Sequence, residues 1–152
     1  MVSLVVIVVA LVRQNLRVAM FLVISVELSG LVIEAAKHAA NRPRPATALV
    51  FAPTTAFPSG HALGVMVGVL ALLTVVLPLA HRPLQRWLIA SGVVIVVAIG
   101  IGRVVLNVHH PSDVLAGWAL GYAYFAVCLL MVPPSRPITV ADETQEARGI
   151  AP

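Results

Sequence analysis

Charged residues are scarce in this chain, and their scarcity excludes an ordinary soluble domain. Asp, Glu, Lys and Arg make up 11% of the 152 residues, whereas residues of apolar type make up 60%. Soluble domains carry about a quarter charged residues. Residues 62–80 and 114–134 hold no charge at all. Uncharged apolar runs of roughly 20 residues are typical of transmembrane helices, so the composition predicts an integral membrane protein.

Cysteine is rarer still, because Cys128 is the only one and lies inside an apolar run. A single cysteine excludes a disulfide framework and a cysteine-based zinc cluster. The formal net charge of +4 would suit nucleic acid if the cations formed a stripe, but they stand singly between apolar segments. We therefore expect no nucleic-acid partner.

The apolar segments predict an all-α fold, a polytopic transmembrane helical bundle that forms one membrane-embedded domain over residues 1–152. Four segments are long enough to span a membrane: 18–37, 61–80, 87–107 and 114–132. Segment 2–12 would be only about 16 Å long as a helix, so we expect a partial helix there. The prolines of residues 41–60 exclude a continuous helix, and residues 133–152 form a polar tail.

Two acidic residues interrupt the first predicted span. Glu27 and Glu34 are seven residues apart and therefore share one face of a helix. Because carboxylates are costly in lipid, we expect this face to point into protein.

Cations in short loops predict the orientation of the spans. Alternating spans place one group on one side of the membrane: Arg13, Arg17, Arg82, Arg86 and Arg136. They place a second group on the other side: Lys37, Arg42, Arg44 and Arg103. By the positive-inside rule the first group and the tail lie in the cytoplasm, so the second group faces outside.

The second side carries residues that suit a phosphate group. Arg44 and Arg103 could grip its oxygens bidentately, and Lys37 would add a point charge. The alternative is that such cations only extend to lipid headgroups, and for Arg42 alone this is the better explanation.

The turn "PSGH" at residues 58–61 precedes a long apolar run. The backbone N–H groups of Ser59 and Gly60, with the dipole of the following helix, predict a seat for an anion. Gly60 lets the backbone approach a ligand closely, and Pro58 fixes the entry to the turn. The alternative is a simple helix cap supplied by Ser59.

His109 and Asp113 add reactive groups on the same side. A carboxylate that is hydrogen-bonded to one imidazole nitrogen leaves the other nitrogen able to attack phosphorus, which would give a phosphohistidine. His61 could protonate the leaving oxygen and later activate water. The alternative is a helix cap, in which Ser112 or Asp113 caps the helix that follows Pro111.

These segments together match a three-part family pattern. Lysine, six residues and Arg-Pro correspond to "KHAANRPRP" at residues 37–45, and Pro-Ser-Gly-His corresponds to residues 58–61. Ser-Arg, five residues, His, three residues and Asp correspond to "GRVVLNVHHPSD" at residues 102–113. The chain thus resembles the type 2 phosphatidic acid phosphatase (PAP2) superfamily of lipid phosphate phosphatases, to which the soluble vanadium haloperoxidases are related.

The resemblance implies a role for each matching residue. It assigns the phosphate to Lys37, Arg44, Ser59, Gly60 and Arg103, and catalysis to His61, His109 and Asp113. The family spacing selects His109 as the nucleophile and leaves His110 without a catalytic role. The resemblance also implies that no metal or other cofactor is needed.

Two departures from the family pattern stand out. Gly102 occupies the position where the family usually has serine, so one hydroxyl contact to phosphate is missing. Family members usually have about six transmembrane helices, and the first one and a half have no counterpart here. Either a second copy of the chain supplies the missing packing, or Met1 is not the native start; the sequence leaves both open.

We therefore expect metal-independent hydrolysis of a lipid-linked phosphate or diphosphate through a phosphohistidine, at the outer face of the plasma membrane. By family analogy we prefer a polyprenyl (undecaprenyl) diphosphate, ahead of phosphatidate or phosphatidylglycerophosphate. The alternative from another class is a non-catalytic membrane protein that binds phosphate lipid headgroups. The long apolar segments disfavour a vanadate-dependent oxidase, and basic neighbours disfavour a metal site made of His61, His109 and His110.

Overall fold

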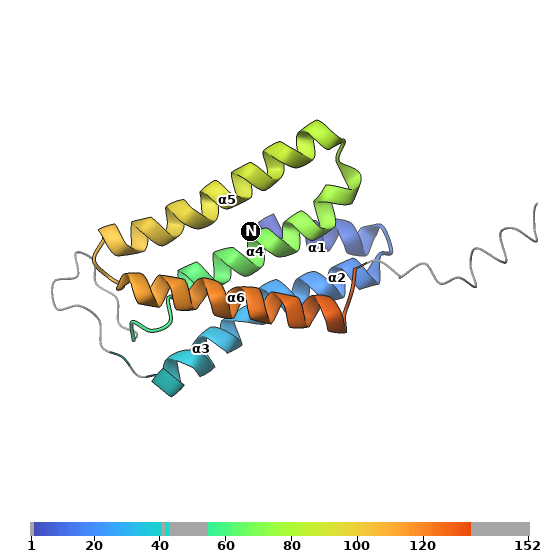
Figure 1. The fold of residues 1–152 in the computed structure, drawn as a ribbon. Helices are drawn as coiled ribbons and strands as arrows, with labels where there is room; N and C mark the ends of the chain where they lie inside the picture. Colours follow the sequence, from blue (N-terminus) through green and yellow to red (C-terminus); the bar gives the residue numbers. More distant parts are fainter. Residues whose placement is uncertain (1, 41, 43–54, 135–152) are drawn as a thin grey trace, which may run out of the picture.

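The computed structural model describes residues 2–40, 42 and 55–134. Their elements follow in this order: α1 (Val2–Val12), α2 (Leu16–Leu22), the π-helical η1 (Val23–Glu27), α3 (Ser29–Ala40), α4 (Gly60–Val76), the 3₁₀-helical η2 (Leu77–Leu79), α5 (Arg82–Val105) and α6 (Pro111–Met131) (Figure 1). These described residues contain helices and no strand. The prediction of an all-α bundle is confirmed.

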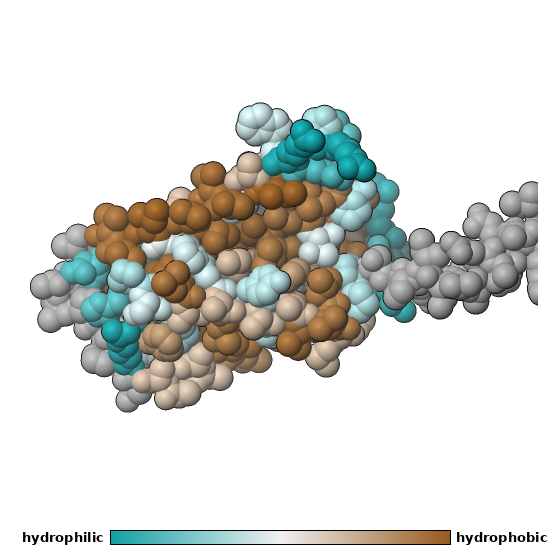
Figure 2. All heavy atoms as spheres, viewed as in Figure 1, coloured by the Kyte–Doolittle hydropathy of each residue, from teal (hydrophilic) through white to brown (hydrophobic). Residues whose placement is uncertain are grey.

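Four helical stretches are long and apolar enough to cross a membrane: Leu16–Ala40, Gly60–Leu79, Arg82–Val105 and Pro111–Met131. They coincide with the four predicted spans except at the start of α5. Residues 82–86 lie between two of the predicted spans but form the first turns of this helix. Pro83 is tolerated there because the first N–H groups of a helix have no acceptor inside the helix, so the N–H that proline lacks is not missed. Apolar side chains form a broad band along the outside of the bundle, with polar groups gathered toward its ends (Figure 2).

Helix α4 lies at the centre of the bundle and packs most extensively against α6 and α5. The close approach of α6 depends on Gly117, because a Cβ atom there would lie 2.6 Å from the carbonyl oxygen of Ser59. Similarly, a Cβ atom on Gly100 of α5 would lie 2.3 Å from the ring of Trp118. Small residues therefore bring the backbones of α4, α5 and α6 together beside the candidate site.

The main apolar core lies away from the candidate site and joins four helices. It consists of Ile7, Ala10, Ala19, Phe21, Leu22, Ala71, Phe125 and Cys128. Phe21 of α2 meets Phe125 of α6 edge to face, with ring centroids 6.2 Å apart. The short α1 folds back against α2 and contributes Ile7 and Ala10, so it belongs to the packed bundle (Figure 1).

The first span changes its helical geometry at η1. The N–H of Leu28 donates to the carbonyl oxygen of Val23, five residues back, at 3.1 Å. The hydroxyl of Tyr124 on α6 donates to the carbonyl oxygen of Ile24, which lies within this turn. One π-helical turn accommodates an extra residue within an otherwise α-helical span, and α6 holds it in place.

The predicted orientation of the two glutamates is wrong. Glu27 and Glu34 are both exposed, whereas Phe21 and Ser25 of the same span are buried. The side of the span that meets α4 and α6 is therefore the side of Phe21 and Ser25, and the glutamates lie on the other side.

The bundle separates the two groups of cations. The end of α3, the start of α4, the end of α5 and the start of α6 gather at one end of the molecule, at the left in Figure 1. The described cations at this end are Lys37, Arg42 and Arg103. The opposite end carries Arg13 and Arg17 in the α1–α2 region and Arg82 and Arg86 in the first turns of α5. Arg44 and Arg136 lie outside the described residues.

Candidate active site

All three sequence motifs meet at Asp113, which lies in the first turn of α6 and is fully buried. Its Oδ1 accepts a hydrogen bond from Nη1 of Arg42 at 2.8 Å, in the first motif segment. Its backbone carbonyl oxygen accepts from the N–H of Ser59 at 2.9 Å, in the second. Its Oδ2 accepts from the N–H of His110 at 2.8 Å, in the third. A single residue thus joins segments that are far apart in the sequence.

His109 lies directly beside this junction and is 4% exposed. The chain reaches it through Asn107, whose φ of 51° lies in the left-handed region that asparagine tolerates better than most residues. The distance from Nδ1 of His109 to Oδ2 of Asp113 is 3.7 Å, which is longer than a hydrogen bond. The predicted hydrogen bond between His109 and Asp113 is therefore not formed in this structure, although the two side chains lie close together. Oδ2 accepts a hydrogen bond from the backbone N–H of His110 instead.

The capping alternative is also present at Asp113. His110 is the N-cap of α6, Pro111 begins the helix, and the carboxylate two residues further on accepts the N–H of His110. Asp113 therefore caps the helix with one oxygen and binds Arg42 with the other. Capping and a catalytic arrangement do not exclude each other here, because the cap fixes the carboxylate beside His109.

Ser59 differs from both interpretations that its sequence allowed. Its hydroxyl makes no cap hydrogen bond to α4, and its buried Oγ has no hydrogen-bond partner among the described residues. Its N–H donates to Asp113 and so is not available to an anion. An anion seat here would use the Oγ of Ser59 and the N–H groups of the first turn of α4, beginning at Gly60, which have no acceptors inside the helix.

A cleft of about 490 Å³ opens beside this turn, between α3, α4 and α5. It is lined by Ile33, Lys37, Gly60, His61, Gly64, Val65 and Ile99. Cε of Lys37 lies 3.8 Å from the place that a Cβ atom on Gly60 would occupy. Arg103 follows Ile99 by four residues and therefore lies on the same face of α5. Lys37 and His61 line the cleft at the start of α4, and the rest of its lining is apolar.

Six of the eight predicted site residues thus lie in the junction or in the cleft beside it: Lys37, Ser59, Gly60, His61, His109 and Asp113. Arg103 lies on the cleft-lining face of α5 by its spacing from Ile99, and Arg44 lies outside the described residues. At Gly102, a Cβ atom would meet no atom within 4 Å, so the missing serine side chain could be accommodated. Within the described ranges, no three histidine, cysteine or acidic side chains cluster to hold a metal ion. The alternative of a site made of His61, His109 and His110 therefore finds no support.

Sequence reasoning missed Arg42 and Ser112 as site residues. Nη1 of Arg42 donates to Oγ of Ser112 at 3.2 Å as well as to Asp113. Arg42 was interpreted as a headgroup contact, yet its side chain is directed to a buried carboxylate. No spacing in the sequence predicts the contact between Arg42 and Asp113, because the two residues are 71 positions apart.

Comparison with known proteins shows to which family the chain belongs. The family model for the PAP2 superfamily matches residues 18–137, and the chain belongs to that superfamily. It is 29% identical, over 142 residues, to an undecaprenyl-diphosphatase of Sulfolobus acidocaldarius, an alignment that covers 89% of this chain and 65% of that protein. The crystal structure of a transmembrane PAP2-type phosphatidylglycerolphosphate phosphatase from Bacillus subtilis superimposes with a TM-score of 0.68 and 26% identity. That superposition covers 79% of this chain and 61% of the other.

The chain therefore spans less than two thirds of the length of these relatives. The resemblance drawn from the three motifs is confirmed. Four apolar helices and transmembrane relatives identify a multi-pass membrane protein.

Proposed function

We propose that this protein hydrolyses a lipid-linked phosphate or diphosphate without a metal ion, through a phosphohistidine. The observation that carries the proposal is the junction at Asp113, which places a buried histidine beside a carboxylate and next to a basic cleft. Membership of the PAP2 superfamily and the names of two relatives support it.

The reaction would proceed in two steps. Nε2 of His109 attacks phosphorus, the bond from phosphorus to the lipid oxygen breaks, and His61 donates a proton to that oxygen. Water then attacks the phosphohistidine, His61 takes up a proton, and phosphate leaves with His109 restored. Lys37, Arg44 and Arg103 would offset the charge on the phosphate oxygens in both steps.

The cleft supports a lipid as the substrate. Its basic end, at Lys37 and His61, suits a phosphate, and its apolar length beside Gly64 and Ile99 suits the first part of a hydrocarbon tail. We place the phosphate near His109 and the tail along α4 toward the bilayer. We favour a polyprenyl diphosphate such as undecaprenyl diphosphate, with phosphatidate and phosphatidylglycerophosphate as the other candidates.

We also propose that the site faces outside the cytoplasm, in the plasma membrane. The described cations support this orientation, because four of them lie at the opposite end of the bundle and three lie at the site. The three at the site have a further reason to be there, since they can bind phosphate or, in the case of Arg42, a carboxylate.

The first test is phosphate release by the purified protein in detergent, with EDTA present. We expect release from undecaprenyl diphosphate or phosphatidate that survives chelation and is inhibited by vanadate. The faster substrate identifies the lipid class. A folded protein that binds phosphate lipids and releases no phosphate from either would favour the alternative of a non-catalytic headgroup-binding protein, which Gly102 in place of serine makes worth testing.

A further inference from the structure

Arg42 lies in the first motif at a position where the family pattern specifies no residue, yet it makes a close side-chain contact to the carboxylate of Asp113. Asp113 is fully buried, and the side chain of Arg42 is 40% exposed. A buried carboxylate is costly unless it is paired and hydrogen-bonded, and Arg42 supplies both the charge and a hydrogen bond of 2.8 Å.

Both ends of Arg42 are held in place. Its backbone carbonyl oxygen accepts a hydrogen bond from the N–H of Ala56 at 2.8 Å, just before the "PSGH" turn. Its Nη1 bridges Oδ1 of Asp113 and Oγ of Ser112. A residue that only extended to lipid headgroups would not need its backbone tied to one motif and its side chain tied to another.

Two hydrogen bonds fix the plane of the Asp113 carboxylate. Oδ1 accepts from Arg42 and Oδ2 accepts from the backbone N–H of His110, both at 2.8 Å, and Oδ2 lies 3.7 Å from Nδ1 of His109. Without Arg42, only the hydrogen bond at Oδ2 would remain, and a carboxylate that is held at one oxygen can tilt about that bond. The charged hydrogen bond from Arg42 therefore helps to hold the carboxylate in its orientation beside the imidazole.

We propose that Arg42 is a positioning residue, which holds Asp113 in the orientation that the reaction at His109 requires. This inference rests on the proposed function, because it concerns the rate of that reaction. It distinguishes Arg42 from Lys37 and Arg103, which are proposed to bind the phosphate itself. Loss of Arg42 should lower kcat and leave substrate binding unchanged.

The test measures kcat and KM for dioctanoyl phosphatidate, together with the inhibition constant of vanadate. We expect Arg42→Gln to lower kcat about 10- to 100-fold, as loss of a group that orients a catalytic residue does. KM and the inhibition constant should stay at the wild-type values. Arg42→Lys keeps the charge on a side chain that is one bond shorter, so it should recover part of the lost rate. Arg86→Gln is the matched control, because it removes one charge from an exposed position at the other end of the bundle.

A double mutant separates action through Asp113 from independent action. Arg42→Gln combined with Asp113→Asn should be no slower than Asp113→Asn alone, because both changes remove the same arrangement. Multiplicative losses, or a raised KM and vanadate constant with kcat unchanged, would overturn the inference. So would a wild-type kcat in a folded Arg42→Gln protein.

Two checks keep the result decisive. If Arg42→Gln does not fold, Arg42→Lys decides: a lower kcat at constant KM supports the inference, and wild-type values of both overturn it. Wild-type protein that releases no phosphate would contradict the proposed function itself, whereas active wild type with an unaffected Arg42→Gln variant would contradict only the role of Arg42.

Discussion

At the scale of the residue, the two adjacent histidines have different environments. His109 is buried beside Asp113, whereas His110 is exposed and donates only its backbone N–H to that carboxylate. The hydrogen bond from the backbone of His110 to Asp113 would remain if the side chain of His110 were replaced. Substitutions at the two neighbouring histidines therefore test the proposal that His109 is the nucleophile.

We expect His109→Ala to lower phosphate release by on the order of 10³-fold or more, because the imidazole would form the covalent intermediate. His110→Ala should stay within a fewfold of wild type. Release of ³²P-labelled phosphate from a labelled lipid measures both rates, and circular dichroism checks that both variants remain helical. The opposite ranking of the two variants would contradict the choice of nucleophile.

The spacing of the motif identified His109 and Asp113, but it could not reveal Arg42. The first relation is local, since the histidine and the aspartate are four positions apart in the sequence. The second depends on how the segment at residue 42 returns to the start of α6. The same limit applies to Ser59, whose N–H was expected to bind an anion and instead binds the backbone of Asp113.

At the scale of the element, α4 presents a row of glycines along one face, at Gly60, Gly64 and Gly68. Gly60 and Gly64 line the cleft, and Gly68 does not. Added Cβ atoms at Gly64 and Gly68 would meet no atom within 4 Å. A Cβ atom therefore fits at both positions, but a side chain at only one of them, Gly64, would extend into the cleft.

We expect Gly64→Leu to impair long-chain substrates and spare short ones. Displacing two methylene groups of a bound tail would cost about 1.6 kcal/mol, or roughly a 15-fold loss in kcat/KM for undecaprenyl diphosphate. The rate for dibutyryl phosphatidate should stay near wild type. Gly68→Leu, which changes helix propensity by the same amount, is the control. Equal losses for both substrates in Gly64→Leu would exclude the cleft as the tail site.

Hydropathy predicted the existence of the spans well and their ends less well. The start of α5 was missed because Arg82 and Arg86 interrupt the apolar pattern, although a helix that leaves the membrane continues into water without difficulty. The π-helical turn was not predicted, because nothing in "VISVE" distinguishes it from an α-helical stretch. It depends on a tertiary contact from Tyr124.

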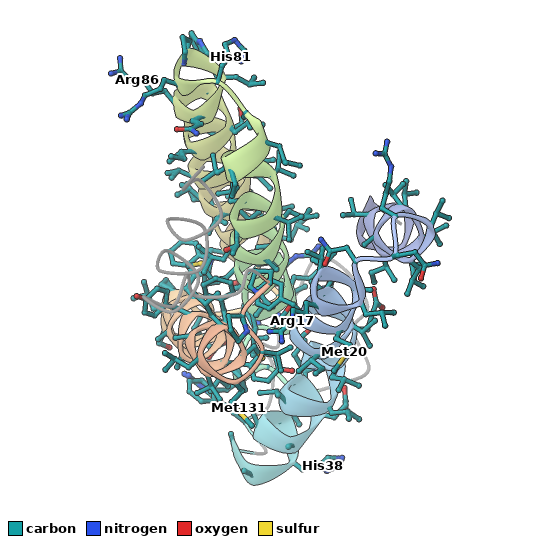
Figure 3. All side chains as sticks on the ribbon, turned by 90° about the vertical axis from the view of Figure 1, so that its right-hand side faces the viewer. Arg17, Met20, His38, His81, Arg86 and Met131 are labelled. Carbon is teal, nitrogen blue, oxygen red and sulfur yellow. The ribbon has the colours of Figure 1, made fainter. Side chains whose placement is uncertain are left out.

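At the scale of the whole molecule, the bundle has two chemically different ends. His38 lies in the last turn of α3 at the site end, and His81 precedes α5 at the other (Figure 3). Both are exposed, and Cys128 is buried in the core. Cysteines introduced at these two histidines can therefore be labelled separately from the native one.

We expect a membrane-impermeant maleimide to label His38→Cys in intact cells, and to label His81→Cys only after the membrane is opened. This result would place the site outside the cytoplasm, as the distribution of cations predicts. The native chain, with Cys128 alone, serves as the blank. Labelling of His81→Cys in intact cells, with His38→Cys protected, would reverse the proposed topology.

The single π-helical turn in the first span has a consequence for the far end of that span. Because this turn accommodates one extra residue, deleting one residue from Val23–Glu27 would give an ordinary α-helix whose residues further along keep their present faces. If the turn became α-helical with all of its residues kept, everything beyond it would rotate by about 100° around the helix axis. Lys37 would then turn away from the cleft that it lines, although no residue of the cleft had changed. The direction in which Lys37 faces is thus set more than two turns upstream, in the first span.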